Sequence, residues 1–600
     1  MGKHRSYKFS LFLKRNDTAL KFYSLNEFNL LSYVLKALAG RQVYVLAIDP
    51  CIPGNRAIIE KVLHFLKVRG LTSWASKVIP ALARYETGFA EISFAHLYPR
   101  FEPEIRSYYQ LDKELQIGAY SLIFKHAASC HVKSHIERIP QLRDLEPELA
   151  ARQVELVGLP YDLCALYEIF YGHSLPRSKP SGRRMRRFMN FVFIALIFAT
   201  AVGNTLRRTR LAVAQTAKTP LGADLAEEGR VRPFFKQIST DPAEILYVMR
   251  NDAVRDKLAD DELARYRHAS LSEGRLPLSE MPSTLWMIFR DSVLLFGNLS
   301  WLPGPVFFSV VKQINKRISF RAFFRRFQFN GFLARDEYNT DHITRSQELR
   351  RRGICSLGLL HGMATAPRVY PHLRYLDFDT IYLFGKRQGE AYAETWPSQM
   401  RVRSFGGYSL TRDQLQEVGQ SASHDILLFG NQWMDPPAHI HLLTELARSF
   451  PDRKIYLKLK YSRDYIGADI HNTYLQQFGE LPSNVEVTTE PPYQLMLKSG
   501  YAFSGLSTVI AEALEIGLIT YFLDVYRPDQ DVFFRDFPDL CLASSQEAIE
   551  RVRAHENGTA VYPREQFGDL VDLSDQNVFD QIREELELPP WPNTQSNVAA

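Results

Sequence analysis

The chain has 600 residues, of which 46% are hydrophobic and 23% charged, a composition that excludes a largely disordered protein. This length is too great for one hydrophobic core, so two or three domains are expected. The formal net charge of +6 says little about partners, and no nucleic-acid partner is expected, although arginines cluster at 183–210 and 317–326. The five cysteines are scattered without a CxxC pair, which argues against a disulfide framework and is typical of a reducing compartment.

Residues 1–180 are predicted to form an N-terminal Rossmann-like part. The run VYVLAID, residues 43–49, is a continuous apolar strand of the kind buried on both faces of a parallel sheet, and a Pro-Gly-Asn break leads from it to an amphipathic helix. No GxGxxG motif follows, so a dinucleotide is not expected. Further along this part, one cysteine with loosely spaced histidines, His126, Cys130, His131 and His135, is weak evidence for a metal. No metal ligands are predicted.

Two apolar runs distinguish residues 181–326. The first, 188–206, has 19 residues between arginine clusters and would be roughly 28 Å long as a helix, barely the thickness of a bilayer core. The second, 292–311, is interrupted by one glycine and two prolines. Monotopic or re-entrant attachment, true crossings and buried core helices are all open interpretations. Because the arginines favour an anionic surface, 181–326 is predicted to be a helical insert that associates with the cytoplasmic face of a membrane.

Short apolar strands alternate with helical patterns from residue 327 onward, on both sides of the polar linker 411–424. This alternation predicts two parallel α/β sheets facing one cleft. Residues 327–412 would complete the N-terminal domain, which binds the acceptor, and 424–590 would form a C-terminal domain that binds the donor.

The stretch AFSGLSTVIAEALEIGLITYFLD, residues 502–524, is predicted to be strand, turn, helix and strand. The turn residues Ser504, Gly505, Ser507 and Thr508 would lie where free backbone N–H groups and the positive end of the helix dipole favour an anion. Glu512, one helical turn further on, could accept hydrogen bonds from a ribose or sugar hydroxyl. The alternative is an N-capped helix that binds no ligand.

The segment 484–524 resembles the C-terminal donor-binding half of GT-B glycosyltransferases, in which an S-G-x-S-T turn and a helix beginning E-A hold the nucleotide and sugar. The resemblance is to the bacterial surface or capsular polysaccharide type, related to the CDP-glycerol glycerophosphotransferase-like superfamily. Many of these enzymes carry Lys-x-His-Pro after an earlier strand, whereas this chain has Lys458-Leu459-Lys460-Tyr461. Lys460 thus replaces the histidine; it keeps positive charge but cannot act as a neutral base.

The segment 350–390 is similar to the part of those enzymes in which a strand delivers His-Gly to the cleft. The resemblance implies that His361 is a general base for the acceptor hydroxyl, because an imidazole with a pKa near neutrality suits that task. Donation to a phosphate, or burial against backbone, are the alternatives. Asp336 and Glu337, at the end of another strand, are further candidates for base or acceptor contact, although a solvated loop explains them equally well.

These features together predict an α/β protein of GT-B-like architecture that moves a sugar from a nucleotide-sugar donor to a lipid-linked or growing surface polysaccharide. The enzyme is expected at the cytoplasmic face of a bacterial inner membrane, without metal or cofactor. The alternatives are a CDP-alditol transferase and a noncatalytic scaffold of the same fold. The predicted donor-binding residues are Asn431, Lys458, Lys460, Glu490, Ser504, Gly505, Ser507, Thr508 and Glu512.

Overall fold

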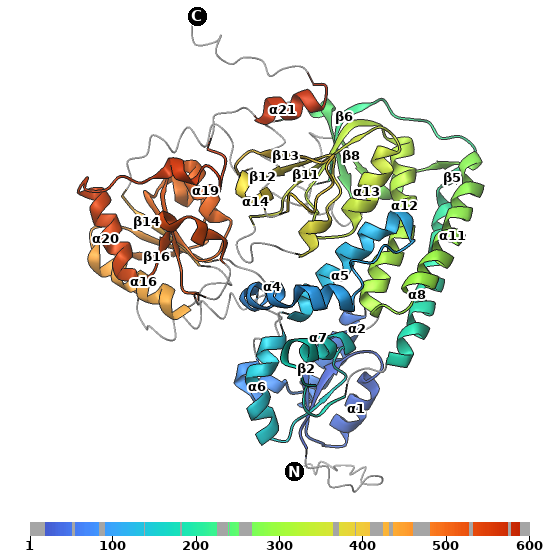
Figure 1. Cartoon of the computed structure of the whole chain (residues 1–600), viewed down its shortest axis with the longest axis horizontal. Coiled ribbons are helices and arrows are strands. Elements are labelled where there is room, and N and C mark those ends of the chain that lie inside the picture. Colours follow the sequence, from blue (N-terminus) through green and yellow to red (C-terminus); the bar gives the residue numbers. More distant parts are fainter. Residues whose placement is uncertain are drawn as a thin grey trace, which may run out of the picture. The chain divides into compact units, whose positions relative to one another are not determined.

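The computed structural model describes residues 19–50, 55–82, 91–136, 138–179, 183–224, 238, 241–250, 267–363, 371–390, 392–407, 424–430, 436–459, 481–526, 528, 532–573 and 578–588 (Figure 1). The described strands form parallel sheets of four, seven and six strands and one two-stranded pair, so the predicted α/β class is confirmed. The chain divides into two compact units. The first contains Met1–Leu196 and Ser292–Val311, and the second contains Ile197–Asp291 and Lys312–Ala600.

The first unit is built on a four-stranded sheet of order β2-β1-β3-β4. The strand predicted at 43–49 is β2, and the amphipathic helices α1 and α2 pack their apolar side chains against it and β1. The elements are β1 (Lys21–Leu25), α1 (Leu30–Leu38), β2 (Val43–Ile48), α2 (Arg56–Val68), α4 (Glu91–Tyr108), α5 (Ser121–Ile136), α6 (Ile139–Ala151), β3 (Glu155–Val157), α7 (Tyr161–Tyr171) and β4 (Ser178–Lys179).

The second unit contains the seven-stranded sheet, whose order is β13-β12-β11-β10-β6-β7-β8. Its strands are β6 (Thr219–Asp224), β7 (Ile245–Met249), β8 (Arg267–Ser270), β10 (Phe329–Ala334), β11 (Cys355–Leu359), β12 (Thr380–Leu383) and β13 (Arg401–Ser404). The structure differs here from the predicted division of the chain. Residues 181–326, expected to be a helical insert, supply three strands of this sheet, and 1–180 form a sheet of their own.

One of those strands, β6, lacks the usual sequence pattern of a buried strand for a physical reason. Thr219–Asp224 has the sequence TPLGAD, and a proline within a central strand cannot donate a hydrogen bond to its neighbour. Gly222 is nevertheless needed, because a side chain there would approach the ring of Phe332 to 2.7 Å. The small residues of β6 therefore make room for the phenylalanines of β10.

The boundaries between the two units fall within three long helices, α8 (Arg183–Arg208), α11 (Met281–Leu299) and α12 (Gly304–Arg326). The second apolar run, 292–311, spans the end of α11 and the start of α12, and its side chains Leu295, Leu299, Phe307 and Val310 are fully buried. Of the interpretations above, buried core helices describe this run. Further along α12, Phe320, Phe323 and Phe324 pack on one face of the seven-stranded sheet.

The six-stranded sheet has the order β16-β15-β14-β17-β18-β19, with helices on both faces (Figure 1). Ile426 and Leu428 of β14 pack against α16 and α20, whereas Leu427 and Phe429 pack against α18 and α19. Such continuous apolar strands are typical of a parallel sheet covered on both sides. The elements are β14 (Ile426–Gly430), α16 (Pro436–Ser449), β15 (Ile455–Leu459), β16 (Val485–Thr488), α18 (Pro492–Leu497), β17 (Tyr501–Ser504), α19 (Val509–Ile516), β18 (Ile519–Leu523), β19 (Cys541–Leu542) and α20 (Ser545–Glu556).

The last described segment, residues 578–588, belongs to the seven-stranded sheet rather than to the six-stranded one. Ile582 and Leu586 are fully buried in a core shared with β6, β10, β11 and β12, and Asn330 donates a hydrogen bond to the carbonyl oxygen of Leu586 at 2.8 Å. The predicted 424–590 domain therefore ends before this segment. The remaining elements of the unit are β5 (Thr209–Arg210), β9 (Leu276–Pro277), α13 (Asp341–Arg350), α14 (Lys386–Glu390) and α21 (Val578–Glu585).

Candidate functional site

Ligands of open α/β sheets bind beyond the carboxyl ends of the strands, at the point where the strand order reverses. In the six-stranded sheet that point lies between β14 and β17, which are neighbours although they are first and fourth in the chain. β17 ends at Ser504, and the residues from Gly505 to Thr508 lead directly into α19. The predicted turn is thus placed where this fold receives a ligand.

The hydroxyl groups of this turn differ in their surroundings. Ser504 is 1% exposed, and its Oγ has no hydrogen-bond partner among the described residues. The Oγ of Ser507 accepts a hydrogen bond from the backbone N–H of Val509 at 3.4 Å, and Thr508 is the N-cap residue of α19. A buried hydroxyl without a partner is costly, so a ligand oxygen that reached Ser504 would gain an interaction the protein itself leaves unmade.

His361 follows β11 in the other sheet, and its backbone is fixed on both sides. Its N–H donates to the Oε1 of Glu337 at 2.6 Å, and its carbonyl oxygen accepts from the guanidinium of Arg335. The exposed imidazole stands edge-to-face against the ring of Tyr338, with 5.1 Å between centroids. The ring is therefore held in a defined place at a solvent-accessible position.

The next two residues bring this turn to the start of α19. Gln388 donates to the carbonyl oxygen of Gly362 at 3.1 Å, and the N–H of Met363 donates to the Oγ1 of Thr508 at 3.1 Å. Gly362 has no room for a side chain, because a Cβ there would lie 2.9 Å from the same Oγ1. The His-Gly turn of one sheet and the Ser-Thr turn of the other are in direct contact.

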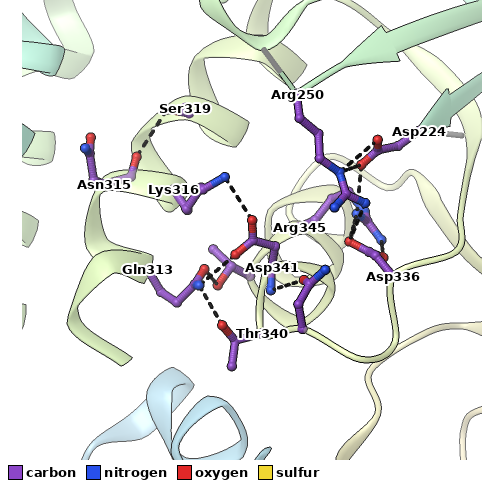
Figure 2. A network of polar contacts seen from close by, with 12 residues as sticks. Asp224, Arg250, Gln313, Asn315, Lys316, Ser319, Asp336, Thr340, Asp341 and Arg345 are labelled. Atoms are coloured by element: carbon purple, nitrogen blue, oxygen red, sulfur yellow. Dashed lines mark hydrogen bonds and ion pairs between the residues drawn. The ribbon is translucent and has the colours of Figure 1, made fainter. Parts of the chain in front are cut away.

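Asp336 is not placed to act as a base. It is completely buried, and Arg345 binds both of its oxygens at 2.7 Å while Arg250 lies 3.1 Å away (Figure 2). Burial alone would raise the pKa of Asp336, but the charge of Arg345 and then of Arg250 outweighs it and holds the pKa below the usual range. The hypothesis of a solvated or catalytic Asp336 fails because two guanidinium groups occupy its oxygens.

The same network includes Asp224, so two carboxylates and two guanidinium groups fill the end of β6 and β10 (Figure 2). β6 and β10 are the neighbouring strands at which the order of the seven-stranded sheet reverses. Beside it, Gln313 of α12 donates to Thr340 at 2.8 Å and to Asp341 at 2.9 Å, which ties the start of α13 to α12. At this sheet the reversal point is occupied by the protein's own charges.

Glu337, the neighbour of Asp336, has a different environment. Its carboxyl group is also buried, and burial raises its pKa to about 8, although the hydrogen bond from the N–H of His361 acts in the opposite direction. The contact with that backbone makes Glu337 a support of the histidine turn. In this structure Glu337 positions the histidine turn, whereas the sequence predicted it as a base or a contact for the acceptor.

Glu512 lies on α19 as expected, and it is only 4% exposed. Glu515, one turn further along the same helix, accepts the N–H of Gly407 at 2.9 Å, and burial raises its pKa well above the ordinary value. A side chain at Gly407 would meet this carboxyl group at 2.3 Å. The two acidic residues of α19 thus face the loop that follows β13 of the other sheet.

The remaining predicted donor residues divide into two groups. Lys458 is half-buried near the end of β15, and burial lowers its pKa. It pairs with Phe429 of β14, which in turn pairs with Ser504 of β17, so Lys458 and Ser504 lie at the same level of the sheet. Glu490 instead forms an ion pair with Lys498 at 2.8 Å near the surface. Asn431 and Lys460 lie outside the described residues.

Sequence reasoning missed three residues that organise this site: Arg335, Gln388 and Glu515. Each is distant in sequence from the residue it supports, by 26 positions for Arg335 and His361, 26 for Gln388 and Gly362, and 108 for Glu515 and Gly407. The spacing E-A-L-E on α19, with two acids on one helix face, was a usable signal for Glu515. No comparable signal existed for the other two.

No protein-family model matches the sequence, and a comparison with curated protein sequences found no match. Among solved structures, a UDP-GlcNAc 2-epimerase from Neisseria meningitidis aligns over 62% of this chain and 99% of its own, with 13% identity and a TM-score of 0.38. The lipopolysaccharide outer core galactosyltransferase WaaB aligns over 62% and 99%, with 11% identity and a TM-score of 0.35. The wall teichoic acid polymerase TagF aligns over 68% and 97%, with 10% identity and a TM-score of 0.35. TM-scores of this size do not establish a common fold, so the functional conclusion rests on the chain's own geometry.

Proposed function

We propose that the protein is a nucleotide-sugar-dependent glycosyltransferase of GT-B type that transfers a sugar to a lipid-linked or growing surface polysaccharide. One observation carries the proposal: the N–H of Met363, two residues after His361, contacts Thr508 at the N-terminus of α19. An exposed imidazole from one doubly wound sheet is thereby set beside the ligand-binding end of another. A glycosyl transfer needs this pair of functions, a base for the acceptor and an anion site for the leaving nucleotide.

In the proposed reaction the Ser504–Thr508 turn and the N-terminus of α19 hold the phosphates of the donor, and Lys458 adds positive charge from the same edge of the sheet. His361 removes the proton from the acceptor hydroxyl as that oxygen attacks the anomeric carbon of the sugar. The bond from this carbon to the nucleotide phosphate breaks, and its electrons leave with the phosphate oxygen. Glu337, Arg335 and Gln388 keep the histidine turn in place during the step.

The experiment combines binding and turnover on the purified full-length protein. Calorimetry with UDP, CDP and GDP and their sugars identifies the donor, and Ser504→Ala and Thr508→Ala are each expected to weaken its binding by about 10- to 100-fold, the cost of a hydrogen bond to a charged group. His361→Gln is expected to leave donor binding nearly unchanged and to lower turnover by at least about 100-fold.

The matched controls are Ser544→Ala and His424→Gln. Ser544 caps α20 on the same sheet, where its Oγ accepts from Glu547 at 3.2 Å, but it follows β19 rather than the reversal point; His424 is an exposed histidine that precedes β14. Full turnover in His361→Gln would refute the assignment. Preference for CDP-glycerol would identify the alditol phosphate alternative, and donor binding without any transfer would identify a scaffold.

Attachment to the cytoplasmic face of a bacterial inner membrane belongs to the same proposal, and α8 is the element that supports it. One helix in the described part of the chain, Arg186–Arg208, is long and apolar enough to cross a membrane, and only 28% of its most apolar window is buried. Phe188, Phe191 and Leu196 are 55–59% exposed on α8, which begins with arginines. An exposed apolar face beside a basic cluster suits an anionic bilayer surface.

A further inference from the structure

The first unit contains a cluster of three side chains with the donor atoms of a metal site. His131 and His135 lie one turn apart on α5, and Asp162 lies in the first turn of α7. One ligand atom from each lies within 4.8 Å of the other two. His135 and Asp162 are buried, and the side chain of His131 is 12% exposed.

Two of the three distances between these atoms match those that one ion imposes on its ligands. The Nε2 atoms of the two histidines are 3.0 Å apart, and the Nε2 of His131 is 3.5 Å from the Oδ2 of Asp162. Ligands about 2.0–2.1 Å from a zinc ion are about 2.9 Å apart at a right angle and about 3.4 Å apart at the tetrahedral angle. The Nε2 lone pairs of two neutral imidazoles would repel each other at this separation unless a proton or a cation lay between them.

The surroundings orient the carboxylate toward the histidines. The hydroxyl of Tyr108 donates to the Oδ1 of Asp162 at 2.7 Å, and Arg186 donates to the same oxygen at 3.1 Å. Both partners occupy Oδ1, so Oδ2 is the oxygen directed to His131. Outer partners of this kind fix ligand orientation in known metal sites. The nearby Asp49 is engaged by Ser24 and Arg138, each at 2.7 Å, and is not a ligand.

The cluster also lines a cavity of about 630 Å³, a size typical of small-molecule sites. Asn26, Asp49 and Gly158, which come after the ends of β1, β2 and β3, line the same cavity. The order β2-β1-β3-β4 reverses between β1 and β3, so the cavity lies at the ligand-binding end of the first unit's own sheet. An ion held by three residues would keep a coordination position for a molecule in this cavity.

We propose that His131, His135 and Asp162 bind one zinc ion, and that its open coordination position faces the cavity at the carboxyl edge of the four-stranded sheet. Two imidazoles with one carboxylate suit a borderline transition metal, whereas Mg²⁺ and Ca²⁺ prefer oxygen ligands throughout. Three protein ligands with one open position are the arrangement of zinc sites that act on a bound molecule. The site is independent of the proposed sugar transfer, because it uses none of the residues assigned to donor binding or to the acceptor base.

Calorimetry and metal analysis of the chelator-treated, dialysed full-length protein test the assignment. Wild type is expected to bind one equivalent of Zn²⁺, and Co²⁺ in its place is expected to give the visible absorption of a four-coordinate cobalt site with histidine ligands. His131→Ala and Asp162→Asn should weaken Zn²⁺ binding by more than about 100-fold, and Tyr108→Phe by about 10-fold, the effect of losing an outer partner. Mg²⁺ in excess should not displace the zinc.

Asp162→Asn and His173→Ala separate metal binding from folding. Asparagine keeps the shape of Asp162 and an acceptor for Tyr108 and Arg186 but removes the negative charge beside Arg186, so zinc affinity is compared at a temperature at which circular dichroism shows the metal-free variant to be folded. His173 is an exposed histidine of the same unit beside Glu146, and its replacement should leave zinc binding unchanged. Wild type without stoichiometric zinc, or zinc binding retained in both ligand variants, would overturn the proposal in favour of a hydrogen-bonded His-His-Asp chain; tighter binding of Mn²⁺ than of Zn²⁺ would overturn the choice of metal.

Discussion

Asp336 and Glu337 are adjacent carboxyl groups, both buried, and their environments give them opposite properties. Asp336 is ionised because Arg345 and Arg250 bind its oxygens. Glu337 instead accepts a hydrogen bond from the backbone N–H of His361, and burial favours its protonated form. Sequence alone could not distinguish them, because the difference arises from partners directly after β7, on α13 and in the turn after β11. At the residue scale, the local environment decides which carboxyl group titrates near neutrality.

Replacing Glu337 by glutamine tests this environment through the pH dependence of stability. The folded pKa of about 8 lies above the ordinary value, so the folded state retains a proton that the unfolded state releases, and wild-type stability is expected to fall as pH rises from about 4.5 to about 8. Glu337→Gln, which keeps an acceptor for the N–H of His361, should remove this decline. The melting temperature of the variant relative to that of wild type should therefore be higher at pH 8 than at pH 5.

The control for that series is Glu584→Gln, which removes one exposed carboxyl group of α21 and reports the effect of a surface charge. Melting curves of Glu337→Gln that run parallel to those of wild type across the whole pH range would contradict the proposed environment. A gain at pH 5 that disappears at pH 8 would contradict its sign.

Among the helices, the two apolar runs of the chain differ in how far their side chains are buried. The run 292–311 is interrupted between α11 and α12, and Leu295, Leu299, Phe307 and Val310 belong to the protein core. The run 188–206 is continuous within α8 and leaves Phe188, Phe191 and Leu196 exposed. Spacings of three and eight residues place these side chains on one side of a helix.

Replacement of these three residues by serine tests membrane attachment by α8. Burial of such a side chain is worth about 1.5–3 kcal/mol, so the triple variant should bind vesicles containing anionic lipid at least about 100-fold more weakly than wild type. Flotation or sedimentation with vesicles measures this directly. Because the residues are exposed, the melting temperature in solution should hardly change.

Vesicles of neutral lipid provide the comparison for the basic cluster, because they lack the negative charge that the arginines would bind. Binding to anionic vesicles that depends on the arginines should also weaken as ionic strength rises. Equal vesicle binding by the triple variant and wild type would remove α8 as the attachment element. A wild-type protein that stays in solution with every lipid would remove membrane attachment altogether.

At the scale of the whole molecule, three doubly wound sheets repeat one rule, that a ligand site lies where strand order reverses. The six-stranded sheet places Ser504 there, the four-stranded sheet places the cavity with the His131 cluster there, and the seven-stranded sheet fills the position with Asp224 and Asp336 bound to arginines. Because that position is filled, the candidate base of this sheet is His361, which follows the neighbouring strand β11.

The packing of residues 578–588 against the seven-stranded sheet predicts a long-range effect on stability. Leu586→Ala should destabilise the core formed with β10 and β11 by about 2–5 kcal/mol, the usual range for a buried leucine. Hydrogen exchange of peptides from β10 and β11, measured on the full-length protein, reports this locally. Glu584→Ala on the exposed side of α21 should change exchange little, and unchanged protection in Leu586→Ala would show that the segment does not support the sheet.

The sequence alone predicted the alternation of strands and helices from 329 to 523, and the structure has this alternation in the described residues of that range. It could do so because a strand buried on both faces must be continuously apolar, and because a turn rich in serine, threonine and glycine marks the passage to a helix. The position of Ser504–Thr508 at a strand's carboxyl end followed from the same local pattern, as did the place of His361 directly after β11.

The contacts that these residues make depend on the tertiary fold. Met363 and Thr508 are 145 positions apart, and Asp162 lies 31 and 27 positions beyond the two histidines it approaches, distances over which no periodic pattern carries information. The strands β6 and β8 were missed for the same reason, since Thr219–Asp224 and Arg267–Ser270 are held in the sheet by their neighbours rather than by their own propensity. Local chemistry fixes which elements form, whereas burial and partnership, which decide charge and function, depend on residues that the fold brings from elsewhere.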